Sequence, residues 1–389
     1  MAMRVPAEQN VGVTMMKFFL ALSLTPLTSV ALAQATPDPA LAVPLQPAPT
    51  EATSNPLTFY GFIDGYYGYD FRHAGTQARP GFLYSHNRQN EFTVNQGLLG
   101  ARYQDDKVRG AIGLHAGSYV SANYANEEQV FRHIYEAYAG FQPLEKAWLD
   151  VGIFGSHIGF ESAISKENWT LTRSLLAENS PYYEAGARFT YELNSKLTLT
   201  ALVLNGWQRI RENNQAKAVC TQIQWKPTDK LLLNSSSFYG NEQPRDSVRR
   251  RRYFHDFYAT YSATDRFSLA IVFDVGKQEN ERSGAVADTW HTGAVFVRYQ
   301  LTDKWTTTLR GEYYNADRGV IISSFSPVVG DARFQVKGVS LNFDYAPASN
   351  VLFRVEGRGL NAENNIFPQK DGKTSDSYGN VTSSIAISF

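Results

Sequence analysis

The feature that most limits the fold of this chain is a short polar turn that recurs along it. Asp, Asn, Ser and Pro favour tight turns because their side chains or rings stabilise the turn backbone. Apolar or aromatic residues flank each copy, and the copies lie about 35–50 residues apart, which fits a strand, a loop and a returning strand. The seven copies span residues 104–107, 143–146, 193–196, 227–230, 263–266, 301–304 and 346–350.

Seven such turns join eight hairpins, so we expect an all-β fold of about 16 antiparallel strands in up-and-down order. The other connections are long and polar, as in residues 72–90, 208–215 and 363–377. Short turns at one end and long loops at the other are typical of a closed barrel that spans a membrane. Aromatic residues beside the turns predict girdles at the membrane–water interface: Tyr103, Trp148, Tyr191, Trp225, Trp305 and Tyr345. A β-sandwich with a polar outer face is the alternative, and it does not explain these aromatic residues.

Charged residues occupy alternate positions in several of the predicted strands. Successive side chains of a strand point to opposite faces. A charge on the lipid face of a barrel costs roughly 2–4 kcal/mol at the bilayer midplane, so these charges should point into a wet lumen. The predicted lumen residues are Arg188, Arg298, Arg310, Glu312, Arg354, Glu356 and Arg358.

The N-terminal residues predict an export signal. Lys17 precedes an apolar run over residues 18–24, and Ala31-Leu32-Ala33 places small residues where a signal peptidase cuts. We therefore expect a signal peptide over residues 1–33, with residues 1–14 as an upstream extension. Residues 34–56 contain many prolines and predict an extended periplasmic leader, and residues 57–389 form the barrel domain.

The chain ends in a strand-like run whose last residue is aromatic. Ile385 and Ile387 alternate with small residues before Phe389. A terminal Phe with apolar residues two and four positions before it resembles the signal that the barrel-assembly machinery of the outer membrane recognises. Together with the export signal and the hairpin repeat, it predicts an outer-membrane protein.

The longest informative connection runs from His157 to Tyr182. Residues 171–179 have helix-forming character, and Thr170 is a suitable N-cap. We hypothesise that this loop folds into the barrel and narrows the pore; an ordinary extracellular loop is the alternative. The charged residues that would set pore size and selectivity are Glu161, Lys166, Glu167, Arg173 and Glu178.

Four sequence runs resemble one known family. They are FYGFIDGYY at 59–67, GSHIGFES at 155–162, NWTLTRSLLAENSP at 168–181 and LNGWQ at 204–208. These runs resemble the β-barrel porin family 2, the OmpL-like outer-membrane porins, and the resemblance extends over residues 57–389. It implies a porin-like barrel in the outer membrane of a diderm bacterium. The family's solute preference is poorly defined, so it implies no particular solute.

Composition and motifs exclude several other functions. Lys plus Arg and Asp plus Glu both number 37, so the chain lacks the basic excess of a nucleic-acid-binding protein. The single cysteine, Cys220, cannot form an internal disulfide. The histidines lack metal-ligand spacing, and we find no catalytic triad and no cofactor motif. We therefore predict no enzyme activity, no metal and no cofactor.

The predicted function is passive diffusion of small hydrophilic solutes or ions through a water-filled, charge-lined barrel. The alternatives are a structural or adhesive barrel with a closed lumen, and a barrel enzyme. The expected partners are the lipid bilayer, the barrel-assembly machinery and lipopolysaccharide. The arginine run at 249–252 suits the phosphates of lipopolysaccharide. A solvated loop face is the alternative for this run, and it is the one that charge runs form more often. A homo-oligomer is a further expectation, and the sequence does not derive a trimer.

Overall fold

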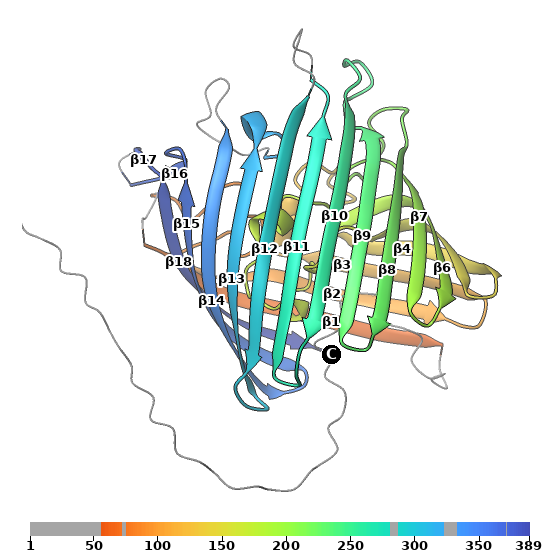
Figure 1. The fold of residues 1–389 in the computed structure, drawn as a ribbon, viewed down its shortest axis with the longest axis horizontal. Coiled ribbons are helices and arrows are strands. Elements are labelled where there is room, and N and C mark those ends of the chain that lie inside the picture. Colours follow the sequence, from red (N-terminus) through yellow and green to blue (C-terminus); the bar gives the residue numbers. More distant parts are fainter. Residues whose placement is uncertain (1–55, 72–74, 281–286, 323–332, 371) are drawn as a thin grey trace, which may run out of the picture. The chain divides into compact units, whose positions relative to one another are not determined.

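The computed structural model describes residues 56–71, 75–280, 287–322, 333–370 and 372–389. Within them, 16 antiparallel strands close into one barrel, in which β1 pairs with both β2 and β18 (Figure 1). The predicted fold class, an up-and-down barrel of about 16 strands, is therefore confirmed. The predicted signal peptide over 1–33 and residues 34–55 of the predicted leader lie outside the described residues.

The barrel strands are β1 (Leu57–Asp70), β2 (Phe92–Gln104), β3 (Val108–Ala116), β4 (Ile134–Leu144), β5 (Ala147–Gly155), β6 (Tyr183–Asn194), β7 (Leu197–Leu204), β8 (Ala218–Thr228), β9 (Leu231–Asn241), β10 (Arg251–Ser262), β11 (Phe267–Gln278), β12 (Asp288–Gln300), β13 (Trp305–Ala316), β14 (Phe334–Ala348), β15 (Val351–Ala362) and β18 (Ser377–Ser388). A separate two-stranded sheet, β16 (Phe367–Pro368) with β17 (Thr374–Ser375), lies in the loop between β15 and β18.

Each predicted turn is a short connection between two paired strands. In the first, the Asp105 carboxylate accepts hydrogen bonds from the backbone N–H groups of Lys107 (2.9 Å) and Val108 (2.7 Å). This side chain therefore replaces backbone partners that the turn leaves unpaired. The carboxyl terminus lies at the same end of the barrel as these turns (Figure 1).

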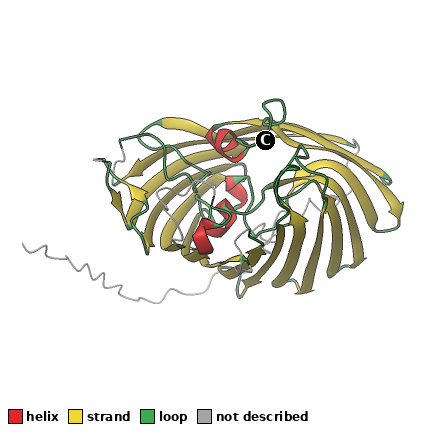
Figure 2. Cartoon of the chain, turned by 90° about the horizontal axis from the view of Figure 1, so that it is seen from above, coloured by secondary structure: helices red, strands yellow, loops and turns green. Residues whose placement is uncertain are grey.

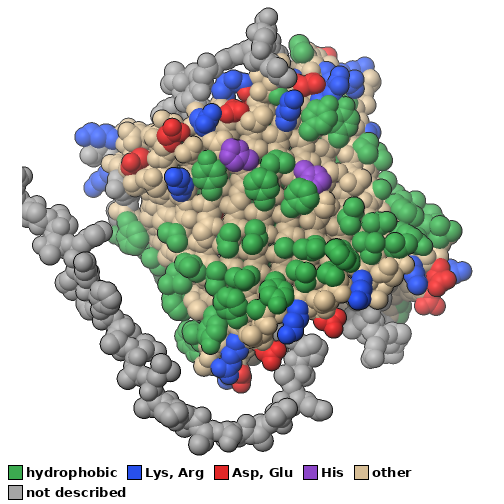
Figure 3. Space-filling view, in the orientation of Figure 1, with side chains coloured by type: hydrophobic (Ala, Val, Ile, Leu, Met, Phe, Trp, Pro, Cys, Tyr) green, Lys and Arg blue, Asp and Glu red, His purple; other side chains and the backbone are tan. Residues whose placement is uncertain are grey.

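Alternation along the strands separates an apolar outside from a polar inside. On β10 and β11, Phe257 and Phe273 are exposed, whereas Asp256 and Asp274, one residue away, are buried. The exposed apolar side chains form a belt across the wall, and charged side chains gather above and below it (Figure 3). This pattern is that of a barrel surrounded by lipid.

The last residue takes part in closing the barrel. The N–H of Phe389 donates to the carbonyl of Gly61 (3.0 Å), and the N–H of Gly61 donates back to Phe389 (2.6 Å). A Cβ atom on Gly61 would lie 2.2 Å from the Phe389 ring, so only glycine leaves room for that ring. Ile385 and Ile387, the other residues of the predicted assembly signal, pair with Gly65 and Ile63 of β1.

The helices of the described residues are short: α1 (Ser118–Asn123), α2 (Leu175–Glu178), and the 3-10 turns η2 (Ser165–Glu167) and η3 (Asp317–Gly319). None of the described helices is long and apolar enough to cross a membrane. The helix expected over residues 171–179 is therefore limited to α2, and its N-cap is Ser174 rather than Thr170. Figure 2 shows helical turns enclosed by the ring of strands.

Candidate functional site

The connection between β5 and β6, residues 156–182, lies inside the barrel, and we call it the inward segment. Phe160 and Trp169 of this segment belong to a buried apolar cluster with inner-wall residues of β9 to β12. The wall residues of the cluster are Leu232, Tyr258, Ala270, Val272, Ala294 and Phe296. An irregular segment seldom remains buried unless its polar backbone groups find partners.

Arginines of the wall bind the carbonyl groups of the inward segment. Arg310 of β13 donates to the carbonyl of Thr172 (2.6 Å) and to the Thr170 hydroxyl (2.9 Å). Arg354 of β15 donates to the carbonyls of Ser165 (2.5 Å) and Asn168 (2.9 Å). Both arginine side chains are buried.

Carboxylates and an amide of the same wall bind the N–H groups of the segment. The N–H of Thr172 donates to Glu356 (2.5 Å), and the N–H of Leu175 donates to Glu312 (2.7 Å). The N–H of Leu171 donates to the Asn342 side chain (3.1 Å). In a helix over residues 171–179 the Thr172 carbonyl would accept from the N–H of Leu176, but it accepts from Arg310 instead, and α2 begins only at Leu175.

The charges of this wall neutralise one another. Arg310 pairs with Glu356 (2.9 Å), and Arg354 pairs with Asp344 (2.8 Å). The remaining arginine, Arg358, pairs with Glu312 (2.8 Å). Three guanidinium groups therefore face three carboxylates. Five predicted lumen residues (Arg310, Glu312, Arg354, Glu356 and Arg358) thus lie together on the inner wall, where the inward segment covers them.

Of the charged residues predicted in the segment, Glu161 binds a backbone group within the segment, and Glu178 binds backbone groups of the loop between β1 and β2. Glu161 accepts hydrogen bonds from the N–H (3.0 Å) and hydroxyl of Ser174. Burial raises the pKa of Glu161 from its usual 4.5 to about 6. Glu178 accepts from the N–H of Tyr84 (2.9 Å) and from Ser85, so it joins the segment to the loop between β1 and β2.

Arg173 binds within the segment, whereas Lys166 binds residues outside it. Arg173 donates to the carbonyl of Ala163 (2.7 Å), and its guanidinium lies 4.2 and 4.0 Å from the ring centres of Tyr119 and Tyr182. Lys166 donates to the carbonyl of Ser349 (2.9 Å) in the β14–β15 turn and to the Ser388 hydroxyl (2.6 Å). Burial raises the pKa of Glu167 above its usual value.

The remaining two predicted lumen residues lie elsewhere. Arg188 of β6 binds the carboxylate of Asp150 on β5 (2.9 Å). Arg298 of β12 is half-buried, and its guanidinium lies 5.7 Å from the ring centre of Trp169 in the inward segment.

Sequence analysis did not single out the partners of Arg188. Asp150 also binds Arg109 of β3 (2.7 Å), and nearby on the same wall Arg102 of β2 binds Glu136 of β4 (2.9 Å). The alternation of inward and outward positions along a strand also predicts Arg109 and Asp150 as lumen residues, because each lies between outward-facing neighbours. The signal is weaker here because register shifts interrupt β3, β4 and β6.

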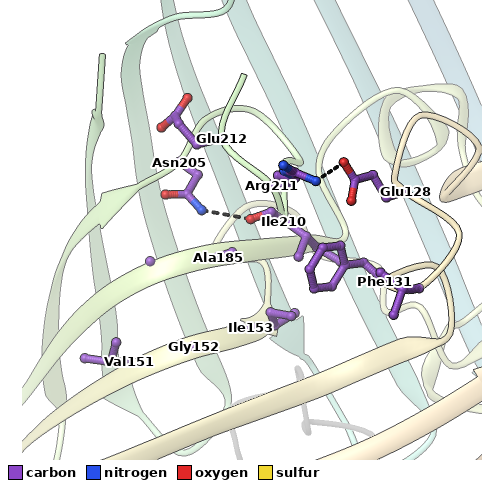
Figure 4. A pocket seen from close by; sticks show the side chains of 12 residues that line it. Glu128, Phe131, Val151, Gly152, Ile153, Ala185, Asn205, Ile210, Arg211 and Glu212 are labelled. Atoms are coloured by element: carbon purple, nitrogen blue, oxygen red, sulfur yellow. Dashed lines mark hydrogen bonds and ion pairs between the residues drawn. The ribbon is translucent and has the colours of Figure 1, made fainter. Parts of the chain in front are cut away.

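A groove of about 580 Å³ lies outside the lumen, against β5 and β6 (Figure 4). Val151 lines it from the outer face of β5, and Arg211 pairs with Glu128 at its rim. It is therefore separate from the charged residues of the interior.

The apolar belt, the charged interior and the inward segment define the class of this protein as a transmembrane β-barrel channel. The sequence model of a family described as "Putative beta-barrel porin-2, OmpL-like" matches residues 56–389. The chain belongs to this porin family, as its sequence motifs predict, and it is a passive diffusion channel of the bacterial outer membrane.

Solved structures of similar fold include one described as a channel, one described as a porin and one described as an outer-membrane protein. The outer-membrane channel DcaP of Acinetobacter baumannii has a TM-score of 0.59 and 14% identity, over 86% of this chain and 97% of that chain. An anion-selective porin from Comamonas acidovorans has a TM-score of 0.57 and 8% identity, over 86% and 99%. OmpT of Vibrio cholerae, in a trimer form, has a TM-score of 0.57 and 10% identity, over 86% and 99%. A comparison with curated protein sequences gives no match.

Proposed function

We propose that the inward segment narrows the water-filled lumen of this porin, and that small hydrophilic solutes diffuse past it along the wall formed by β3 to β6. The observation that supports this proposal most is the set of hydrogen bonds from the wall of β13 to β15 to the segment backbone. Arg310 and Arg354 alone donate to three of its carbonyl groups. A segment bound in this way stays in the lumen, so it limits the width of the passage.

The proposal assigns two roles to the charged residues of the interior. Arg310, Glu312, Arg354, Glu356 and Arg358 anchor the segment, together with its own Glu161, Lys166, Glu167, Arg173 and Glu178. Arg188 lines the passage, and Arg298 lies at the edge of the segment. Support for this division comes from burial, because the Arg310 and Arg354 side chains are fully buried, whereas the Arg188 side chain is 12% exposed.

Deleting residues 165–178 and recording single-channel conductance in planar bilayers tests the proposal. We expect a larger conductance, because the deletion removes the part of the segment that binds Arg310 and Arg354. A matched deletion within the loop between β9 and β10, residues 242–250, should leave the conductance unchanged. Equal conductance of the wild type and the 165–178 deletion would contradict the constriction.

We further propose that the protein has no enzyme activity and that its lumen is open rather than closed. The family, the Comamonas acidovorans structure and the Acinetobacter baumannii structure are described as porins or channels, which favours diffusion over catalysis. A barrel with a structural or adhesive role and a closed lumen is the alternative. The same bilayer recordings separate the two, since a closed barrel gives no conductance steps.

The proposed partners are the barrel-assembly machinery, lipopolysaccharide and further copies of this chain. The assembly machinery is proposed to recognise Phe389, Ile387 and Ile385. The phosphates of lipopolysaccharide are proposed to bind the arginines at residues 249–252. A homo-oligomer is proposed because the Vibrio cholerae relative in fold is described in a trimer form. Residues 1–33 are proposed as the cleaved signal and residues 34–56 as the periplasmic leader.

A further inference from the structure

Four residues form one row across the inner face of β3 to β6. Arg109 lies opposite Gly140, Gly140 opposite Asp150, and Asp150 opposite Arg188 in the strand registers. Arg109 donates two hydrogen bonds to Asp150, both of 2.7 Å. Arg188 donates two more to the same carboxylate, of 3.1 and 2.9 Å. One acid therefore holds two guanidinium groups.

Gly140 makes this arrangement possible. Arg109 must reach over β4 to bind an acid on β5. A Cβ atom on Gly140 would lie 2.2 Å from the Asp150 Oδ1 atom and 3.2 Å from the Arg109 Cγ atom. A side chain at position 140 would therefore block the ion pair. The space above Gly140 is filled by the Arg109–Asp150 pair itself.

Aromatic rings fix the two guanidinium groups. The Arg109 guanidinium lies 4.4 Å from the ring centre of Trp148, and that of Arg188 lies 4.3 Å from the ring centre of Phe154. Trp148 pairs with the inner-face residue Thr190, so it faces the lumen and not the outer girdle that its place beside a turn predicts. Such cation–π contacts hold the planar groups in a defined orientation. The two arginines are therefore presented as a rigid pair rather than as mobile side chains.

The row presents positive charge to the lumen. Two arginines face one carboxylate, so the row has an excess of one positive charge. The Asp150 side chain is fully buried, while each arginine side chain is 12% exposed. Both arginines bind Asp150 through Nε and Nη2, and neither Nη1 atom has a hydrogen-bond partner among the described residues. The free N–H groups are thus available to a solute.

A second ion pair on this wall, between Arg102 of β2 and Glu136 of β4, shows the same asymmetry of exposure. The Arg102 side chain is 34% exposed, whereas that of its partner Glu136 is 6% exposed. The Tyr60 hydroxyl donates to the same Glu136 carboxylate and covers it further. On this wall the acids lie beneath their arginines, so a solute in the lumen meets guanidinium groups first.

We propose that Arg109 and Arg188 form a subsite for small oxyanions, and that it makes this channel prefer anions. The inference rests on the proposed function, because it requires solutes to pass along β3 to β6. A guanidinium group matches the planar oxygens of a carboxylate and the oxygens of a phosphate through paired N–H groups. Arg102 extends the positive surface along the lumen.

Reversal potentials in planar bilayers test the subsite, measured under gradients of potassium chloride, potassium acetate and potassium phosphate. The wild type should pass anions in preference to potassium, and the acetate and phosphate arms show whether carboxylates or phosphates pass better. Arg188→Gln leaves a neutral Arg109–Asp150 pair. A unit charge removed at about 6 Å from the ion path in water disfavours anions about threefold and favours cations about threefold, so the anion-to-cation permeability ratio should fall about tenfold.

Two further variants complete the design. Arg188→Lys retains the charge and should retain the anion preference. Arg266→Gln makes the same substitution at an exposed arginine in the β10–β11 turn and should not change the ratio. Heat-dependent gel migration verifies that each barrel is folded. Conductance without anion preference in the wild type, or an unchanged ratio in Arg188→Gln, overturns the subsite and leaves the proposed function standing. Absence of conductance overturns both.

Discussion

Two walls of this barrel have arginines and carboxylates on their inner faces, but the groups are arranged differently. On the wall of β13 to β15, three arginines face three acids, and the inward segment buries them. On the wall of β3 to β6, two arginines share the single acid Asp150 and remain partly exposed. A charge on the inner face of a barrel strand therefore does not by itself identify a pore-lining residue. Its role depends on the ratio of arginines to carboxylates on the wall and on whether another segment covers them.

The largest expected effect is on the covered wall. Arg310→Ala removes the partners of Glu356, Thr170 and Thr172 and leaves a buried carboxylate without its cation. We expect the free energy of unfolding to fall by about 3–5 kcal/mol, the usual loss when one member of a buried ion pair is removed. Urea unfolding followed by tryptophan fluorescence measures it. Arg266→Ala, in an exposed turn, is the control and should change stability by less than about 0.5 kcal/mol. Equal effects of the two substitutions would contradict the anchoring role.

The next largest expected effect is a pH dependence of the free energy of unfolding, caused by Glu161 in the inward segment. Glu161 has a pKa of about 6 in the folded protein, against a usual value of 4.5. The folded state therefore binds this proton more tightly, and the stability that this contributes is fully present below pH 4.5 and is lost as pH rises through about 6. Between pH 4 and pH 7 the free energy of unfolding of the wild type should fall by about 2 kcal/mol more than that of Glu161→Gln. If the two proteins change in parallel, Glu161 is not the group responsible.

The smallest of the three effects on stability is expected on the uncovered wall. Arg188→Ala leaves Asp150 paired with Arg109, and the lost side chain was already in contact with water. We expect the free energy of unfolding to fall by only about 1 kcal/mol. Urea unfolding measures this loss and compares it with the loss in Arg310→Ala. A loss as large as that of Arg310→Ala would remove the distinction between the two walls.

The sequence predicts the barrel because its determinants are local. Turn residues such as Asp105 act on neighbours two and three positions away, and alternation is visible within one strand. The position of the inward segment is not predictable in this way, since Thr172 binds Glu356, 184 residues along the chain. The alternation predicts Arg310 as a pore-lining residue, whereas the anchoring role proposed for it depends on long-range contacts with Thr170 and Thr172. Arg109 and Asp150 were missed because β3 and β5 have only nine residues each and because register shifts interrupt the pairing of β4 with both of them.

Cysteine labelling compares the two walls most directly. In a Cys220→Ser background, Thr190→Cys places a thiol on the inner face of β6, two residues from Arg188. Ser340→Cys places one on the inner face of β14, between Arg310 and Arg358 in the strand registers. A charged, water-soluble thiol reagent should react with the cysteine at position 190 and reduce the conductance, and should leave the cysteine at position 340 unmodified. Rapid modification at position 340, or none at position 190, would show that solutes do not pass along β3 to β6.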